Sequence, residues 1–232
     1  MNIGVIPARL NSTRLPEKIL IPIGGIPMIV RVYRQVQQAK KLDKIIVAID
    51  DEKTQFELER FSVPMIMTGK HHHSGTDRIA EAVKSEDVDI VVNVQGDEPE
   101  IEPELIDELV SLMENSDAEM GTAVSSDLTV DDLDNPDVVK AELNEKDLAV
   151  NFSRQPIKSG RIFRHIGIYA FKKHILEKFI RLSPSEREID RKLEQMRALD
   201  NDISIKAVLT DFAGRGVDTA EDIKQLKNRF AS

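Results

Sequence analysis

The sequence contains no cysteine among its 232 residues. This absence excludes a disulfide framework, a thiolate zinc site and a cysteine nucleophile, and it fits the reducing conditions of the cytoplasm. Any metal ion must therefore be held by oxygen or imidazole ligands. A chain of this length buries about 70–75% of its unfolded surface, so the core is large enough without disulfides.

Long hydrophobic runs are also missing. The first residues form an apolar run of strand length, without the longer hydrophobic segment and cleavage site of a signal peptide. The other apolar stretches are a few residues long, whereas about 20 are needed to cross a bilayer. The sequence therefore predicts a cytoplasmic protein that neither spans nor binds a membrane.

Positive charge is in deficit, with 32 Lys and Arg against 41 Asp and Glu and a formal net charge of −9. The overall field repels nucleic acid and anionic lipid, so no nucleic-acid partner is expected. A small anionic ligand would need a local basic pocket or a divalent metal to overcome this background.

Apolar runs of strand length alternate with helical patterns in the first half of the chain. Alternation at this spacing is typical of parallel βαβ units in a doubly wound sheet, whose ligands bind at the carboxyl ends of the strands. We expect an α/β fold in a single domain, residues 1–232. The expected strands are 3–7, 45–49, 90–94, 138–142, 165–171 and 203–209, and the expected helices are 28–40, 53–61, 76–84, 102–114 and 220–230.

The loop after the first strand is rich in cations and hydroxyls. It contains Arg9, Ser12, Thr13, Arg14 and Lys18. Backbone N–H groups, hydroxyls and guanidinium groups can together surround phosphate oxygens, although the spacing of a P-loop is absent. The alternative from composition alone is a solvated basic loop.

Two acidic segments are candidate metal sites. Asp97 follows the apolar strand 90–94, and carboxylates at such a strand end can hold Mg²⁺ on nucleotide phosphates. Asp218 precedes the last helix, where it is either the N-cap, a role that Thr219 can also take, or a second carboxylate for the metal. A plain strand-ending turn is the structural alternative for Asp97.

Taken together, these segments resemble the CMP-Kdo synthetase family, the 3-deoxy-manno-octulosonate (Kdo) cytidylyltransferases. The resemblance runs almost from end to end. The motifs that carry it are PARLNSTRLPEK (7–18), SGTDR (74–78), NVQGDEP (93–99), NFSR (151–154), RHIGIY (164–169), LEQMR (193–197) and GVDT (216–219).

The resemblance implies a Rossmann-like nucleotidyltransferase fold, with a mostly parallel central sheet flanked by helices and a small sugar-site and dimerisation subdomain. It implies that CMP is transferred from CTP to the anomeric hydroxyl of Kdo, for lipopolysaccharide or capsule precursors, with Mg²⁺ as cofactor and a homodimer as the assembly. The implied catalytic residues are Arg9, Lys18, Asp97 and Asp218, and the last two would bind the metal. Nucleotide contacts would come from Arg9, Ser12, Thr13, Arg14, Lys18, Ser74, Gly75, Thr76 and Arg78, and sugar-acid contacts from Gln95, Arg154, His165, Glu194 and Gln195.

Structural alternatives remain for several of these residues. His165 lies in an apolar strand pattern, where a packed core histidine is common. Glu194 and Gln195 also suit the solvated face of a helix, and the run of histidines at 71–73 is interpreted as a loop, with only His72 matching the family.

The match weakens on the acceptor side. Residues 155–163 form a shorter segment than the family usually has, and residues 183–192 are more highly charged. An amino-substituted Kdo or another ulosonic acid is therefore an alternative acceptor. A metal-dependent glycosyltransferase and a non-catalytic nucleotide-binding protein are alternatives of other classes.

Overall fold

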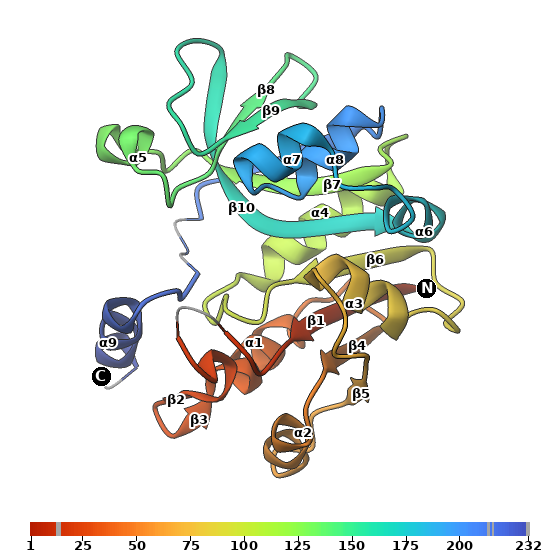
Figure 1. The fold of residues 1–232 in the computed structure, drawn as a ribbon, viewed down its shortest axis with the longest axis vertical. Helices are drawn as coiled ribbons and strands as arrows, with labels where there is room; N and C mark the ends of the chain where they lie inside the picture. Colours follow the sequence, from red (N-terminus) through yellow and green to blue (C-terminus); the bar gives the residue numbers. More distant parts are fainter. Residues whose placement is uncertain (13–14, 213, 215, 231–232) are drawn as a thin grey trace. The chain divides into compact units, whose positions relative to one another are not determined.

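The computed structural model describes residues 1–12, 15–212, 214 and 216–230 (Figure 1). The chain divides into two compact units. Unit 1 comprises Met1–Val88, Asn93–Ile106 and Gly214–Ser232, and unit 2 comprises Asp89–Val92 and Asp107–Ala213. Whether they act as one nucleotidyltransferase domain, as the sequence predicts, stays a prediction.

Unit 1 is built on parallel strands. β1 (Asn2–Ala8) pairs in parallel with β4 (Lys44–Ile49), and β4 pairs in parallel with β5 (Met65–Met67). β6 (Ile90–Val94) follows β1 on its other side in the strand order, and only its last two residues belong to unit 1. The connecting helices are α1 (Met28–Val36), α2 (Glu52–Glu59) and α3 (Gly75–Ala82). The predicted βαβ alternation is confirmed, and the carboxyl ends of β1 and β4 lie at one edge.

The burial of β1 explains its uninterrupted apolar sequence. Ile3, Val5 and Ile6 are all fully buried. Val5 and Ile6 are consecutive, so their side chains point to opposite faces of the sheet, and both faces are therefore covered. Both α1 and α3 contact this strand. A strand covered on both faces needs apolar residues at successive positions, which is why the run 3–7 predicted it.

The last helix of unit 1, α9 (Ala220–Arg229), packs on the hairpin of β2 (Pro22–Ile23) and β3 (Ile26–Pro27). The turn of this hairpin needs glycine, because Gly24 and Gly25 have φ of 55° and 80°. A cluster of buried side chains joins the segments. It consists of Ile23, Met28, Val217, Ile223 and Leu226.

Unit 2 is organised around β7 (Met120–Ser125), which pairs in parallel with β11 (Ile205–Thr210) and antiparallel with β10 (Arg161–Lys172). β8 (Lys140–Leu143) pairs antiparallel with β10 and with β9 (Ala149–Ser153). The helices, of which the first begins in unit 1, are α4 (Pro103–Glu114), α5 (Val130–Asp134), α6 (Lys173–Phe179), α7 (Glu186–Arg191) and α8 (Gln195–Asp200).

The sequence did not predict β7, although all its residues are buried. Its sequence MGTAVS contains glycine and alanine, which are depleted in strands, and its mixture of small and hydroxyl residues shows no apolar alternation. Packing explains the glycine, because a Cβ at Gly121 would lie 2.9 Å from Leu109 Cδ1 and Met113 Sδ. Tertiary contacts, rather than local preference, thus determine this strand.

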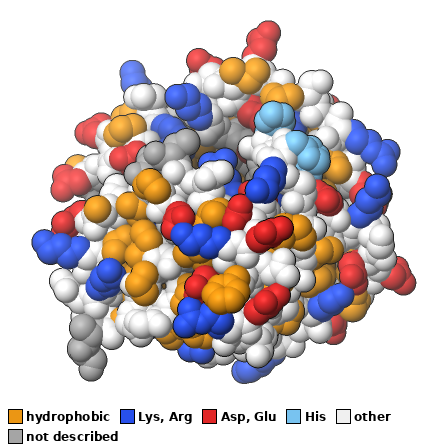
Figure 2. All heavy atoms as spheres, turned by 60° about the horizontal axis from the view of Figure 1, so that its bottom comes forward, with side chains coloured by type: hydrophobic (Ala, Val, Ile, Leu, Met, Phe, Trp, Pro, Cys, Tyr) orange, Lys and Arg blue, Asp and Glu red, His pale blue; other side chains and the backbone are white. Residues whose placement is uncertain are grey.

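The fold-class prediction is confirmed, since the protein is a mixed α/β structure with a mostly parallel central sheet flanked by helices. Among the described residues, no helix combines the length and apolarity of a membrane span. On the face shown in Figure 2, acidic and basic side chains are interspersed with hydrophobic ones.

Candidate functional site

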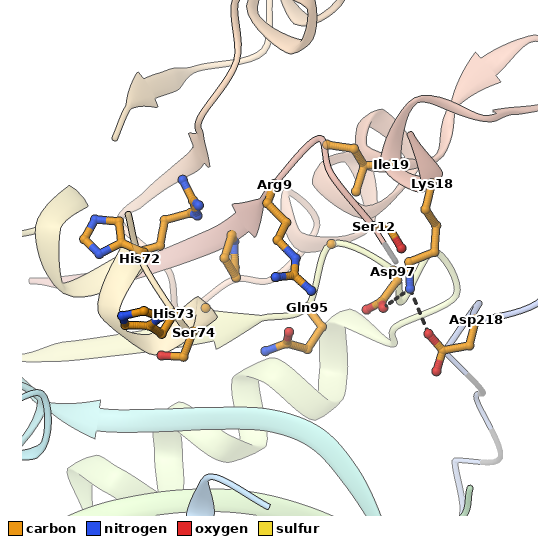
Figure 3. Close-up of a pocket in the computed structure, with 14 residues that line it drawn as sticks. Arg9, Ser12, Lys18, Ile19, His72, His73, Ser74, Gln95, Asp97 and Asp218 are labelled. Carbon is orange, nitrogen blue, oxygen red and sulfur yellow. Dashed lines mark hydrogen bonds and ion pairs between the residues drawn. The ribbon is translucent and has the colours of Figure 1, made fainter. Parts of the chain in front are cut away.

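A pocket of about 270 Å³ lies in unit 1 at the carboxyl ends of β1 and β6 (Figure 3). Loops after these strands, the first turn of α3 and the segment before α9 contribute its walls. The lining residues are Pro7, Arg9, Ser12, Lys18, Ile19, His72, His73, Ser74, Gly75, Arg78, Gln95, Gly96, Asp97 and Asp218.

Lys18 joins the two predicted metal-binding carboxylates within this pocket. Its Nζ donates to Asp97 Oδ2 at 2.6 Å and to Asp218 Oδ1 at 2.9 Å. Figure 3 shows the ammonium between the two carboxylates. Residues that are 79 and 200 positions away from Lys18 in the sequence therefore meet around one cation.

Backbone contacts bring Asp218 beside Asp97. Val217 N donates to Asp97 O at 2.9 Å, and the Val217 side chain belongs to the cluster that docks α9. Gly96 permits a close approach, because a Cβ there would lie 2.9 Å from the Pro7 carbonyl oxygen. A larger residue at position 96 would push the strand ends apart.

The N-cap of α9 is Thr219, not Asp218. The Thr219 hydroxyl accepts from Asp222 N, and Asp222 accepts from Thr219 N in a capping box. The Asp218 side chain is therefore available to contact Lys18 instead of the helix terminus. The structure decides between the two interpretations that the sequence left open for the cap.

The environment of Lys18 keeps it charged. Its side chain is 11% exposed, and burial by itself lowers the pKa of an ammonium group. The neighbouring carboxylates of Asp97 and Asp218 outweigh that effect, so the pKa of Lys18 is raised above its ordinary value. A permanent positive charge thus lies on one side of the pocket.

The remaining cations of the first loop are only partly described. Arg9 and Ser12 line the pocket, and the Arg9 side chain extends into it in Figure 3. Thr13 and Arg14 lie outside the described residues. The predicted cradle for phosphates is thus represented by Arg9, Ser12 and Lys18.

The predicted base-binding segment forms the start of α3. Ser74 is its N-cap and accepts from Asp77 N at 3.1 Å, while Gly75 and Arg78 line the pocket with it. Arg78 is 3% exposed and bonds Asp50 and Thr68. Thr76 is buried and is not among the described residues that line the pocket.

Two histidines that sequence reasoning treated as loop residues line the pocket. His72 and His73 stand on the loop before α3, and His72 Nε2 bonds Glu81 Oε2 on the helix itself. This bond, with a second from Gly69 N, holds the pKa of Glu81 below its ordinary value. The loop prediction agrees with the structure, and the position of His72 and His73 directly before Ser74 is the signal that could have placed them at the site.

Gln95 is the one predicted sugar-acid residue that lines this pocket. It follows β6 and donates through Nε2 to Asn93 Oδ1 at 3.2 Å. The other four belong to unit 2.

His165 is packed among aromatic rings in β10. Its ring centroid lies 5.0 Å from that of Phe152 and 5.5 Å from that of Tyr169. Its Nε2 lies 2.9 Å from Thr122 Oγ1, and burial lowers the pKa of His165 to about 3. At neutral pH the imidazole is therefore uncharged, as expected of a packed histidine, and its predicted contact with a sugar acid stays a prediction.

Glu194 and His165 both lie near Tyr169. Burial, reinforced by the negative charge of Glu194, raises the pKa of the Tyr169 hydroxyl well above its ordinary value. Tyr169 is a polar side chain that sequence reasoning left without a role, although it ends the motif RHIGIY. The phenol stays protonated and can act as a hydrogen-bond donor.

Gln195 is buried in the first turn of α8, and Arg154 is half-buried after β9. Arg154 Nη1 donates to Pro136 O at 3.0 Å, and its carbonyl accepts from the buried Lys140 at 2.8 Å. Gln195 is not on a solvated helix face, which was one alternative for it.

The highly charged segment 183–192 contains a capped helix, α7. Ser185 and Glu188 form the capping box of α7, and Arg197 on α8 binds Glu188 through two nitrogens at 2.8 and 2.5 Å. Arg187 and Ser185 both contact Asp200. These ion pairs hold α7 against α8, and Gln195 is the first residue of α8.

The donor set in the pocket suits Mg²⁺. In the part of the chain that the structure describes, no three His, Asp or Glu side chains form a group that could hold a metal ion. Mg²⁺ commonly uses one or two carboxylates and completes its shell with phosphate oxygens and water. Asp97 and Asp218 both contact the ammonium group of Lys18, so they lie close enough to bind one cation together, and their side chains are 30% and 40% exposed. The pair therefore fits a metal that arrives with a phosphate ligand.

Comparisons with known proteins identify relatives over the whole chain. The family model "Cytidylyltransferase" matches residues 3–205. A 3-deoxy-manno-octulosonate cytidylyltransferase of Chloroherpeton thalassium is 44% identical over 234 residues, which cover 96% of this chain and 95% of that protein.

Solved structures give the same result. CMP:2-keto-3-deoxy-manno-octonic acid synthetase, solved in complex with CTP, matches with a TM-score of 0.94 and 33% identity, over 99% of this chain and 98% of the other. A putative glucose-1-phosphate thymidylyltransferase of Bacillus anthracis, 16% identical, shares the fold with a TM-score of 0.69 over 99% and 95% of the two chains. The Rossmann-like nucleotidyltransferase prediction is thus confirmed. The chain belongs to the cytidylyltransferase family, and within it to the 3-deoxy-manno-octulosonate cytidylyltransferases.

Proposed function

We propose that this protein transfers CMP from CTP to the anomeric hydroxyl of Kdo, releasing pyrophosphate. The observation that carries the proposal is the meeting of Lys18, Asp97 and Asp218 in a pocket also lined by Arg9 and Ser12. The similarity to a synthetase solved with CTP supports the same nucleotide here. The product would serve lipopolysaccharide or capsule precursor synthesis.

The chemistry needs no covalent bond between enzyme and substrate. The anomeric hydroxyl of the sugar acid attacks the α-phosphorus of CTP in line, and the bond to the pyrophosphate oxygen breaks. The positive charges of Arg9 and Lys18 bind the triphosphate and stabilise the negative charge that develops on the departing pyrophosphate. Catalysis then rests on orientation and electrostatics, for which a preorganised cationic pocket is suited.

We further propose that Asp97 and Asp218 hold Mg²⁺. When bound, the ion would supply positive charge to the phosphate oxygens. The two carboxylates orient this charge, and Lys18 keeps them close together because it donates to both. Asp97 reaches the site from the end of β6 and Asp218 from the segment before α9, so docking of α9 is part of the metal site.

On the nucleotide and acceptor sides, the assignments follow the family motifs. Ser74, Gly75, Thr76 and Arg78 would lie near the cytosine, whereas Gln95, Arg154, His165, Glu194 and Gln195 would contact the sugar acid. The neutral His165 and the protonated Tyr169 offer hydrogen-bonding groups rather than charge. Arg154 is the cationic candidate for the carboxylate of the acceptor.

The proposal includes a homodimer in the cytoplasm. Family resemblance supports the dimer, and the cytoplasmic nucleotide substrate supports the location. Light scattering at micromolar concentration should give twice the mass of 26.1 kDa. A mass equal to that of one chain would refute the dimer.

A pyrophosphate-release assay tests the function. It combines the purified protein, CTP and Mg²⁺ with Kdo, 8-amino-Kdo and other ulosonic acids, each in turn. We expect release that depends on Kdo. CTP binding without release would identify a non-catalytic nucleotide-binding protein, and turnover of a nucleotide sugar instead would identify a glycosyltransferase. A kcat/KM for Kdo about a hundredfold below that for the amino analogue would correct the acceptor and leave the reaction class unchanged.

A further inference from the structure

A largely buried carboxylate outside the pocket connects two of its walls. Asp50, at the carboxyl end of β4, accepts from Leu10 N through Oδ1 at 3.0 Å. Its other oxygen, Oδ2, accepts from Arg78 Nη2 at 3.0 Å. Leu10 follows Arg9 in the first loop, and Arg78 lines the pocket from α3, whereas Asp50 is not among the described lining residues.

Further bonds fix the guanidinium that Asp50 contacts. Arg78 Nη1 donates to Thr68 Oγ1 at 2.6 Å, and the Thr68 hydroxyl donates to Ile49 O at 2.7 Å. The side chains of Arg78 and Asp50 are 3% and 13% exposed. Water has little access to these groups, so a donor or acceptor that lost its partner in this network would stay unpaired at a cost in free energy. The orientation of Arg78 is therefore set by strand ends rather than by solvent.

We propose that Asp50 is a positioning residue for the nucleotide: it fixes the loop that carries Arg9 and Ser12 relative to Arg78 and the start of α3. This inference deepens the proposed function and rests on it. The carboxylate acts on the substrate only through its two donors, one on each wall. Its loss should weaken CTP binding, because the phosphate-side and base-side groups would no longer be held at a fixed separation before CTP arrives.

The requirement is for a carboxylate in particular. Each of its oxygens takes one donor, and one of the donors is permanently charged. An asparagine has a single oxygen, so it can accept from Leu10 or from Arg78 but faces the other donor with its own N–H groups. Asp50→Asn thus removes one of the two connections with almost no change in volume, and Asp50→Ala removes both.

The adjacent Asp51 supplies a matched control. It is the N-cap of α2, accepts from Lys53 N at 2.9 Å and lies 3.2 Å from Lys70 Nζ. Asparagine is also a good N-cap, so Asp51→Asn makes the same chemical change one position along without breaking the helix start. Neither of these contacts of Asp51 involves Leu10 or Arg78.

The test measures CTP affinity by calorimetry without sugar acid, so that no turnover occurs. We expect Asp50→Asn to raise the Kd for CTP at least tenfold, Asp50→Ala to raise it further and Asp51→Asn to leave it within twofold. At saturating CTP, the KM for the sugar acid should stay within twofold in Asp50→Asn. A merely structural role would lower the melting temperature without this selective effect on CTP.

Amide hydrogen exchange supplies a second readout that needs no ligand. The Leu10 amide should exchange at least tenfold faster in Asp50→Ala than in the wild type, because its acceptor is removed. A CTP affinity within twofold of wild type in both Asp50 variants, or unchanged exchange at Leu10, would overturn the inference. If the wild-type protein bound no CTP, the proposed function would fail instead, and the exchange at Leu10 alone would decide whether Asp50 holds the loop.

Discussion

Replacing Asp97 with Asn tests whether this carboxylate has a catalytic role or only a structural one. The substitution keeps the shape of the side chain and one oxygen acceptor, but it removes a negative charge from the pocket. In the structure this charge lies 2.6 Å from Lys18 Nζ, which also bonds Asp218 at 2.9 Å. The effects on folding and on turnover should therefore differ greatly in size.

The cost in folding stability should be small. The amide oxygen can still accept from the charged Lys18 ammonium, so only the attraction between opposite charges is lost, which for a partly exposed pair is about 1 kcal/mol or less. Repulsion between the carboxylates of Asp97 and Asp218 disappears at the same time, and Lys18 keeps Asp218 as its partner. We expect the melting temperature to fall by no more than about 4 °C in a chain of this size.

The cost in activity should be much larger. If Asp97 orients Mg²⁺ on the phosphates, its loss should lower kcat/KM at least a hundredfold, which corresponds to about 2.7 kcal/mol of transition-state stabilisation. Higher Mg²⁺ concentrations should restore part of the rate. The assay is pyrophosphate release against a Mg²⁺ titration, together with thermal unfolding of each variant.

Glu102→Gln is the matched control. Glu102 is exposed just before α4, and the substitution makes the same carboxylate-to-amide change a few residues away. It should leave both the rate and the melting temperature almost unchanged. Turnover of Asp97→Asn within threefold of wild type, with the same Mg²⁺ dependence, would refute the assignment. A fall of more than about 10 °C in its melting temperature would show instead that the carboxylate is mainly structural.

Three further predictions concern the base, the acceptor and pH. If residues 74–78 read the cytosine amino group, kcat/KM for UTP should be at least tenfold below that for CTP, because a buried group left unpaired costs about 1–3 kcal/mol; equal values would refute this role. Arg154→Ala should raise the sugar-acid KM while the CTP KM changes little, and the opposite pattern would place Arg154 on the nucleotide side. Burial lowers the pKa of His165 to about 3, whereas a histidine in the unfolded chain titrates near 6.5. Between these pH values the unfolded state binds more protons at this residue, so wild-type stability falls as the pH decreases from 6.5 toward 3. We expect this loss of unfolding free energy, up to about 2 kcal/mol between pH 6.5 and 5, to be missing in His165→Gln and present in the exposed control His174→Gln. Urea unfolding at several pH values measures it, and the same dependence of stability on pH in both variants would show that His165 is not buried as a neutral ring.

The sequence predicted the strands that are buried on both faces better than those fixed by tertiary contacts. β1, β4 and β6 are mostly apolar runs, and their expected positions agree with the structure within one residue. β7 was missed because its glycine and hydroxyl residues carry no apolar pattern, although packing against α4 requires a small residue at Gly121. The short helices α6 and α7 were also missed, whereas a helix was one interpretation for Glu194 and Gln195, where α8 begins. The contact of α7 with α8 depends on ion pairs between the two helices, such as that of Glu188 with Arg197.

The candidate site was predictable where a motif ends a strand, and less so where a long-range contact selects between two roles. Asp97 follows β6 directly, so its place at the sheet edge follows from the fold. The position of Asp218 depends on the bond from Val217 N to Asp97 O and on the packing of α9, and neither can be recognised in the sequence. The link from Asp50 to Leu10 and Arg78 joins three segments of unit 1 and has no local signal.

Helix capping nevertheless supplies a rule that would have separated these roles. Asp51, Ser74 and Thr219 are N-caps with extended backbones, and each side chain turns back to accept from an amide of its own helix. In an extended chain, consecutive side chains point to opposite sides, so the residue just before each cap points away from that helix. Those preceding residues are Asp50, which holds Leu10 and Arg78, His73, which lines the pocket, and Asp218, which contacts Lys18. At these three helix starts the cap residue therefore bonds its own helix and the residue before it faces the pocket or another segment, although Ser74 both caps α3 and lines the pocket.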